Sequence, residues 1–102
     1  MLELRPNCEL CDKDLPPNSR EARICSYECT FCAACVDNVL HDVCPNCGGG
    51  FSTRPIRPAN SHREGVSLEQ QPASQNRKQC KFNSAEIEEI SAMLRDIPPE
   101  ER

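Results

Sequence analysis

The stretch that decides the fold runs from residue 8 to residue 47. It reads CELC at residues 8–11, CSYECTFCAAC at residues 25–35 and CPNC at residues 44–47, and it contains eight of the nine cysteines. A gap of two residues lets one tight turn aim both sulfurs at the same ion, and zinc takes four such ligands at about 2.3 Å. The stretch therefore predicts two four-thiolate sites for two Zn2+ ions. The predicted ligands are Cys8, Cys11, Cys25, Cys29, Cys32, Cys35, Cys44 and Cys47.

The composition leaves little material for a hydrophobic core. The chain has 102 residues, of which 37% are hydrophobic and 4% aromatic, and it contains no Trp. A domain of this size generally needs disulfides, metals or a partner to stay folded. Structural zinc contributes roughly 10–16 kcal/mol in small peptides, which exceeds the stability of most domains this small. We therefore predict a small metal-stabilised α+β fold built around its metal sites.

Several features of the sequence favour metal ligation over disulfides. The segment Met1–Pro6 lacks the apolar stretch and cleavage site of a signal peptide, and no apolar run approaches the ~20 residues of a membrane helix. We therefore expect a cytoplasmic protein, and disulfides are rare in that reducing compartment. The odd number of cysteines also argues against a disulfide framework.

The charge of the chain disfavours nucleic acid as a partner. The formal net charge is −4, and two four-thiolate zinc sites would each add a net charge of about −2. A phosphate-backbone binder would show a basic face instead. A nucleic-acid-binding finger would rest only on Arg54, Arg57 and Arg63.

Composition divides the chain into three segments. Residues 1–58 hold the eight paired cysteines and form the predicted two-zinc domain. Residues 59–81 are polar and without periodicity, which predicts a flexible, disordered linker. Residues 82–97 regain an apolar pattern and predict an amphipathic helix.

The C-terminal helix is predicted from its cap and from its apolar face. Asn83 is a good N-cap residue, Glu86 three positions later completes a capping box, and Pro98 and Pro99 end the helix. One face carries the apolar residues Ile87, Ile90, Met93, Leu94 and Ile97. This face predicts a contact, which could be with a protein partner, with the metal-binding domain of the same chain or with a second copy of the helix.

Within residues 1–58 the local sequence predicts a few short elements. Residues 22–24 suit a short strand, residues 32–40 a short helix and residues 51–53 a last strand. Val36, Val39 and Leu40 are expected to share one apolar stripe of the helix, and the three glycines at 48–50 predict a turn. This order of elements is typical of a treble-clef or cross-braced zinc finger. It consists of a first C-x-x-C turn, a hairpin, a helix that carries cysteines and a last C-x-x-C turn.

The layout of the cysteines also resembles that of RING finger domains. Phe31 immediately precedes Cys32, Val36 immediately follows Cys35, and residues 44–47 have the C-P-x-C form common in RING domains. The resemblance implies a cross-brace in which one ion is held by Cys8, Cys11, Cys32 and Cys35 and the other by Cys25, Cys29, Cys44 and Cys47. The alternative is sequential filling, with the first four cysteines on one ion and the last four on the other. We favour the cross-brace, because interleaving closes long loops and ties both ends of the domain to one centre.

Two positions depart from the RING pattern. Cys29 stands where RING domains usually have His, and the gap before it is three residues rather than one. Gly48 stands where RING ubiquitin ligases often carry a basic residue, although Leu10 occupies the apolar position that contacts the conjugating enzyme. A glycine after a C-P-x-C knuckle has its own structural reason, because the turn needs a positive φ and backbone N–H groups aimed at sulfur.

A second resemblance is carried by LELRPNC at residues 2–8, DLPP at 14–17, ARICS at 22–26, ECTFC at 28–32 and CPNCGG at 44–49. These segments are similar to a family of short, cysteine-rich bacterial proteins of unknown function. The resemblance covers residues 1–58 and implies a bacterial, cytoplasmic, zinc-finger-like protein. It brings no activity with it, and a bacterial origin weakens the ubiquitin hypothesis because the partner machinery is mostly absent there.

Iron–sulfur ligation is the alternative to zinc. The run from Cys29 to Cys35, followed by Cys44-Pro45, is spaced like a ferredoxin motif. Such a cluster would leave Cys8, Cys11 and Cys47 without a role, whereas two zinc ions use all eight cysteines. We therefore predict zinc.

Three chemically active residues lie outside the predicted sites. His41 follows the expected helix and is interpreted as a helix-end residue rather than a ligand. His62 lies in the polar segment and is expected to be solvated. Cys80 is unpaired and stands among basic residues, which makes it a candidate redox handle or site of an intermolecular disulfide.

The sequence shows no catalytic constellation, because all paired ligands are cysteines and both sites are expected to be closed. The leading hypothesis is a non-catalytic zinc-binding module that docks a protein partner, with residues 82–97 as a second contact. The alternatives are a RING-type ubiquitin ligase and a thiol-based redox switch in which oxidation ejects zinc.

Overall fold

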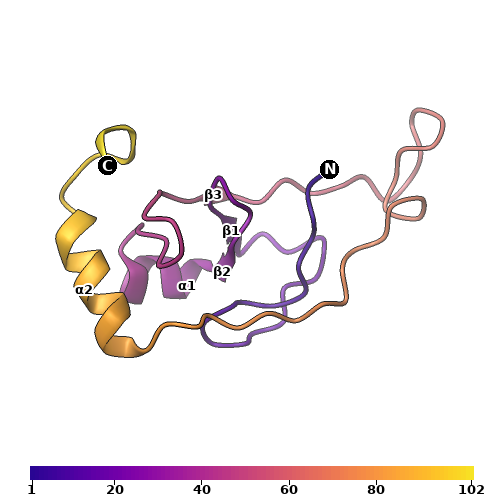
Figure 1. Cartoon of the computed structure of the whole chain (residues 1–102). Coiled ribbons are helices and arrows are strands. Elements are labelled where there is room, and N and C mark those ends of the chain that lie inside the picture. Colours follow the sequence, from indigo (N-terminus) through magenta and orange to yellow (C-terminus); the bar gives the residue numbers. More distant parts are fainter.

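The structure is a computed structural model that describes residues 1–102 (Figure 1). The elements are β1 (Ala22–Ile24), β2 (Thr30–Cys32), α1 (Ala33–Cys35), the π-helical turn η1 (Val36–Leu40), β3 (Ser52–Thr53), α2 (Ser84–Leu94) and the 3₁₀ turn η2 (Pro99–Glu101). The molecule is elongated, with extents of 46 × 27 × 18 Å, because a loop in the second half of the chain projects away from the end that carries α2 (Figure 1). No helix is both long enough and apolar enough to span a membrane.

A three-stranded antiparallel sheet with the order β2-β1-β3 lies at the centre. Arg23 of β1 is opposite Phe31 of β2 on one side and opposite Thr53 of β3 on the other. The strands predicted at residues 22–24 and 51–53 are therefore confirmed, the second one as residues 52–53. The turn from β1 to β2 places Glu28 at a φ of 67°, so this non-glycine residue occupies the left-handed region just before Cys29.

The predicted helix over residues 32–40 is present as α1 followed directly by η1. The amide of His41 bonds to the carbonyl of Val36, which is the wider spacing of a π-helix. The wider turn keeps Val36 and Leu40 on the buried face but rotates Val39 outward, where its side chain is 42% exposed. The prediction that Val39 shares their stripe was wrong for this reason.

Cysteines make up half of the central buried cluster. The other six of its twelve residues include Leu15, Phe31 and Leu40. Phe51 packs edge-on against Phe31, with ring centroids 5.5 Å apart. A core built around thiols fits the small apolar content of the sequence, and the structure is a small α+β fold as predicted.

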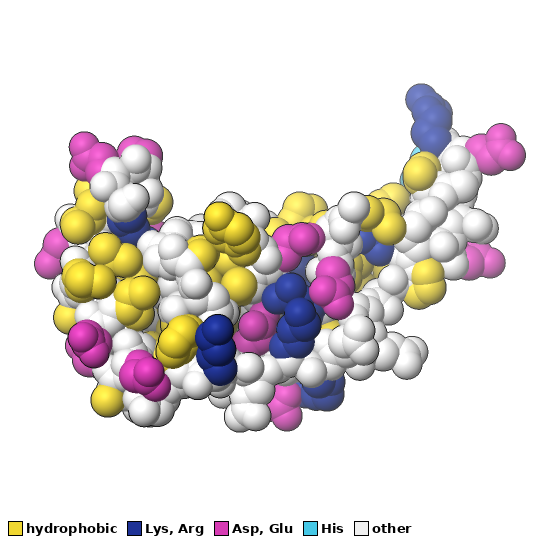
Figure 2. All heavy atoms as spheres, in the orientation of Figure 1, with side chains coloured by type: hydrophobic (Ala, Val, Ile, Leu, Met, Phe, Trp, Pro, Cys, Tyr) yellow, Lys and Arg dark blue, Asp and Glu magenta, His cyan; other side chains and the backbone are white.

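Two buried or half-buried arginines hold the loops around this core. Arg54 is 1% exposed and donates hydrogen bonds to the carbonyls of Arg5, Leu15 and Pro16. Arg57 donates to the carbonyls of Leu2 and Gln71. Of the three arginines considered for nucleic-acid binding, Arg54 and Arg57 thus bond to distant segments of the protein, and Arg63 donates to the carbonyl of its neighbour His62. On the face shown in Figure 2, Lys and Arg side chains are interspersed with Asp and Glu and form no continuous basic patch.

After the projecting loop, the chain returns along the N-terminal segment and forms α2, which lies beside η1, before the final turn η2 (Figure 1). The capping box is present as predicted, since the Asn83 side chain accepts from the Glu86 amide and Glu86 bonds back to the Asn83 amide. The helix spans 84–94, shorter than the predicted 82–97, because Asn83 is the N-cap and residues from Arg95 onward leave the helix.

The face of α2 that was predicted to be apolar packs on the cysteine-rich domain of the same chain. Ile87 is 3% exposed within the central cluster, and the buried hydroxyl of Ser91 donates to the carbonyl of Leu40 over 3.0 Å. Met93 is 64% exposed on the same helix, so the prediction that it shares the apolar contact face with Ile87 was wrong. Self-association through residues 82–97, a partner contact and the flexibility of residues 59–81 stay predictions.

Candidate metal centres

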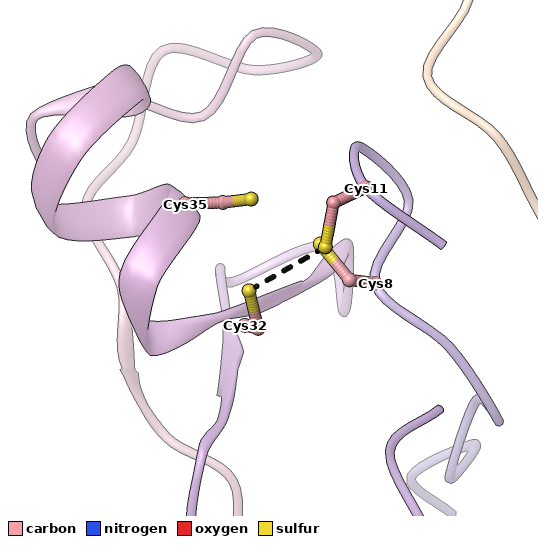
Figure 3. A group of neighbouring side chains, drawn as sticks. All are labelled: Cys8, Cys11, Cys32 and Cys35. Carbon is pink, nitrogen blue, oxygen red and sulfur yellow. Dashed lines mark hydrogen bonds between the residues drawn. The ribbon is translucent and has the colours of Figure 1, made fainter. Parts of the chain in front are cut away.

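The sulfurs of Cys8, Cys11, Cys32 and Cys35 form the first cluster and lie within 4.8 Å of one another. Figure 3 shows the four side chains turned toward a common centre, Cys8 and Cys11 from the N-terminal turn, Cys32 from the end of β2 and Cys35 from α1. The sulfurs of Cys11 and Cys32 are 3.8 Å apart. Four sulfurs at about 2.3 Å from a tetrahedral ion would be separated by about 3.8 Å, so this thiol spacing fits zinc.

The second cluster consists of Cys25, Cys44 and Cys47, again with sulfurs within 4.8 Å of one another. The fourth predicted ligand, Cys29, is buried and its carbonyl accepts a hydrogen bond from the Cys25 amide, although its sulfur lies outside this tight group. Three residues separate Cys29 from Cys25, and the last of them, Glu28, has a left-handed φ of 67°. Seven of the eight predicted ligands thus gather in two groups, with Cys29 adjacent to the second.

The grouping of the thiols is interleaved rather than sequential. The first and third cysteine pairs share one cluster, and Cys25 and the last pair share the other. All nine cysteines are free thiols, so the disulfide alternative is not present in the structure. The fold therefore assembles two separate clusters of thiols, each of which could hold a metal ion.

Two turns of nearly identical construction, here called the knuckles, carry the outer cysteine pairs. In residues 8–13, the amide of Asp12 bonds to the carbonyl of Cys8, and the amide of Cys8 bonds to the carbonyl of Lys13. In residues 44–49, Gly48 bonds in the same way to Cys44, and Cys44 to Gly49. The residue after the second cysteine has a φ of 65° in Asp12 and 80° in Gly48. The positive φ that was predicted for Gly48 is confirmed.

Backbone amides also point at the sulfurs of the second cluster. The amide of Tyr27 donates to Cys25 Sγ over 3.3 Å, and the amide of Gly49 donates to Cys47 Sγ over 3.4 Å. Such bonds favour the ionised form of a thiol. They orient the ligands from the surrounding chain, as outer partners do around metal ligands in proteins.

The pKa values of the thiols are shifted by their close neighbours and by burial. A hydrogen bond from the Cys44 thiol lowers the pKa of the Cys25 thiol to about 5, and the same bond raises the pKa of Cys44. Burial raises the pKa of Cys29 and of Cys35. Thiolates this close repel one another, so they do not ionise together without a cation between them. A divalent ion removes the repulsion and binds the ionised form.

Sequence reasoning missed the buried carboxylate between the first two ligands. Glu9 is 4% exposed, and its Oε2 accepts hydrogen bonds from the amide of Thr30 at 2.6 Å and from Arg5 at 3.0 Å. The carboxylate thereby ties the first knuckle to β2, which carries Cys32. The only local signal was an arginine four residues before an acidic residue inside the first C-x-x-C turn.

The other residues singled out from the sequence lie outside both clusters. His41 caps the end of η1 with a φ of 49°, as expected for a helix-end residue. His62 is exposed in the projecting loop. Cys80 is half-buried, and its amide donates to the carbonyl of Glu9 over 2.6 Å.

Comparison with known proteins places this domain in a family. Residues 1–57, which hold both clusters, match the family described as "Protein of unknown function (DUF1272)". The chain belongs to this family. An uncharacterized protein of Rhizobium meliloti (strain 1021) is 62% identical over 60 residues, which cover 59% of this chain and 71% of that protein. No solved structure matches the chain. The family match excludes residues 58–102, which contain α2.

Proposed function

We propose that the chain is a zinc-stapled protein-interaction module with no catalytic role of its own. The observation that carries the proposal is the pair of interleaved all-thiolate clusters at the centre of the core. Four thiolates close the coordination of a zinc ion and leave no position for a substrate, which is typical of structural rather than catalytic sites.

The residues present fit zinc at both centres. Cys8, Cys11, Cys32 and Cys35 would hold one ion, and Cys25, Cys44, Cys47 and Cys29 the other. The sulfur spacing of 3.8 Å in the first cluster supports this set, as do the amide-to-sulfur bonds in the second. Each ion would cross-link strands and turns that otherwise share little apolar contact, and so present a rigid surface to a partner.

A thiol-based redox switch is the second candidate, and exposure favours it. Each cluster has one exposed cysteine, Cys11 in the first and Cys47 in the second. A peroxide could oxidise two thiolates of one centre to a disulfide, with two electrons passing to the peroxide to give water, and Zn2+ would leave. Zinc retained after mild peroxide treatment would rule this candidate out.

The ubiquitin-ligase hypothesis gains no support from the surface. Leu10 packs half-buried against the core cluster, and Gly48 is buried, with Leu94 of α2 next to it. Of the two positions that a conjugating enzyme would contact in a RING ligase, Gly48 is thus covered within the chain and Leu10 is only partly accessible.

The first test is the metal content of the full chain purified without oxygen, by elemental analysis with an absorption spectrum. The proposal expects two zinc ions per chain and no visible band. Iron with inorganic sulfide would instead indicate a cluster protein. A chain with neither metal, folded and with free thiols, would overturn the proposal.

The interaction role needs a second test on metal-loaded protein. Cross-linking in cells would identify a partner, and the purified partner would then be titrated against the loaded chain. Tyr27 and Met93 are exposed apolar side chains on separate elements, so Tyr27→Ser and Met93→Ser sample two surfaces without disturbing the core. Loss of binding in one variant, with two zinc ions retained, would locate the interface. No partner for the loaded chain would leave the interaction role refuted.

A further inference from the structure

The C-terminal part of the chain bonds to the same carbonyl position in both knuckles. Arg77 Nη2 donates to the carbonyl of Asp12 over 2.8 Å, and Arg102 Nη1 donates to the carbonyl of Gly48 over 3.1 Å. Asp12 and Gly48 are the left-handed residues that follow the second cysteine of each knuckle. Both carbonyls belong to the turn that the backbone hydrogen bonds of the knuckle close, so the two arginines contact a feature of the turn itself.

At the first knuckle the contact extends over residues 74–82, here called the strap. The amide of Ser74 bonds to the carbonyl of Leu4, and the amide of Cys80 bonds to the carbonyl of Glu9, which lies in the first knuckle. The buried side chain of Asn7 donates to the carbonyl of Lys78 over 2.8 Å.

The charged side chain of Arg77 completes this contact. It pairs with the carboxylates of Asp12 and Asp14 at 2.8 and 2.7 Å. Exposed ion pairs of this kind contribute little alone. Together with the backbone bonds, they fix the strap against the turn that carries Cys8 and Cys11.

At the second knuckle α2 and the last residue make the contact. A Cβ atom on Gly48 would lie 3.0 Å from Leu94 Cδ1, so the helix packs directly on the turn. Arg102 also donates to the carbonyls of Asp42 and Ile97. Ile87 reaches the central cluster itself. The tail, residues 74–102, therefore spans both knuckles and binds each one at the turn that its cysteines hold.

We infer that the tail is an intramolecular ligand of the two metal-closed knuckles, so that its docking couples the occupancy of one metal centre to that of the other. This rests on the proposed binding of metal at both centres. Drawing the two cysteines of a knuckle onto one ion fixes the turn, and the fixed turn presents the carbonyl that the tail arginine binds. By linkage, a tail that prefers the closed knuckle must strengthen metal binding there by the same factor.

The consequence is a release mechanism built into the fold. Loss of metal from either knuckle removes one anchor of the tail and weakens the other through the shared strap and α2. The apolar face of α2 that includes Ile87, which is 3% exposed in the docked state, then leaves the core. Whether the tail is docked or released thus depends on whether metal occupies the two centres.

The test uses the full chain, loaded with zinc and with its metal content measured for every sample. Hydrogen exchange of the Ser74 and Cys80 amides reports tail docking, and transfer of zinc to a chromogenic chelator reports retention. The variants are Arg77→Gln and Arg102→Gln. Arg63→Gln is the matched control, because Arg63 donates only to the carbonyl of its neighbour His62.

In the loaded chain we expect the two anchor variants to keep two zinc ions and protected amides in β1, while the Ser74 and Cys80 amides exchange at least about tenfold faster than in the wild type. Zinc transfer should be about fivefold faster or more, and Arg63→Gln should match the wild type. Cadmium-113 resonances of the substituted protein would show which centre each variant loosens, and loosening at both centres is the signature of coupling.

Two results would overturn the inference while the proposed function stands. One is two bound zinc ions with tail amides that exchange freely in the wild type. The other is faster tail exchange in both anchor variants with unchanged zinc transfer, which would make the tail a passive cover. A wild-type chain that binds no metal refutes the proposed function itself, and the elemental analysis separates that case.

Discussion

The two knuckles have the same backbone hydrogen bonds, yet they differ at the residue that follows the second cysteine. The first has Asp12 and the second has Gly48, both with positive φ. The carboxylate of Asp12 lies at the surface and accepts hydrogen bonds from Asn7 and Arg77. Gly48 lies under α2, where a side chain would meet Leu94. The residue at this position therefore matches the segment that covers the turn. The polar Asp12 contacts the polar strap, and Gly48 lies under the apolar face of α2.

The largest expected effect comes from removing one thiol from either centre. Cys8→Ser in the first cluster and Cys44→Ser in the second should each lose a metal ion, and each should lose cooperative folding, because a structural zinc contributes about as much as the whole stability of such a domain. Both cysteines are fully buried. Metal analysis and circular dichroism check this.

Cys80→Ser is the control for these variants, since Cys80 lies outside both clusters. It should keep two metal ions and the wild-type fold. If Cys44→Ser folds normally with one ion while Cys8→Ser does not, only the first centre supports the fold, and the two knuckles are not equivalent.

Next in size is the apolar cover of the second knuckle. Ile87→Ala removes a side chain that is 3% exposed in the core cluster. We expect a loss of about 2–4 kcal/mol in the free energy of unfolding, from lost burial and the cavity left behind. Urea unfolding at a fixed zinc concentration measures it. Met93→Ala, on the exposed side of the helix, should cost less than about 0.5 kcal/mol. Equal effects would show that α2 is not docked.

A substitution at Gly48 tests why the second knuckle needs a glycine at this position. Gly48→Ala places a Cβ in the left-handed region and 3.0 Å from Leu94 Cδ1. We expect a loss of about 1–3 kcal/mol, because both the backbone and the helix contact are strained. The double variant Gly48→Ala with Leu94→Ala separates the two causes. If it unfolds at a lower urea concentration than Leu94→Ala alone, the backbone strain is the cause that remains.

Much of the local structure follows from local chemistry and was predicted from the sequence. The C-x-x-C spacing indicates which cysteines share a turn, Gly48 indicates a positive φ, and Asn83 with Glu86 marks the start of α2. Each of these signals involves residues within about one turn of one another. The interleaved clustering of the thiols was favoured through the resemblance to RING domains and because interleaving closes long loops, although spacing alone also permits sequential filling.

The contacts that were missed join residues far apart in the chain. Arg77 meets Asp12 across 65 residues, and Arg102 meets Gly48 across 54. Composition marked residues 59–81 as polar and unpatterned, and it carries no information about backbone bonds such as the one from Cys80 to Glu9. The burial of Glu9 and Arg54 was invisible for the same reason, because charged residues are read as surface residues unless their partners are known.

The smallest effect is expected in the first knuckle, at Asp12, the position that corresponds to Gly48. In Asp12→Gly, relief of the left-handed strain should offset the loss of the bonds from Asn7 and Arg77 to the carboxylate, since Arg77 keeps Asp14 and the carbonyl of residue 12. We expect a change within about 0.5 kcal/mol in urea unfolding. Asp12→Ala, which loses the carboxylate and keeps the strain, should cost more, about 1 kcal/mol. If the glycine variant is as unstable as the alanine variant, the carboxylate holds the first knuckle, and the strap matters there as much as α2 does at the second.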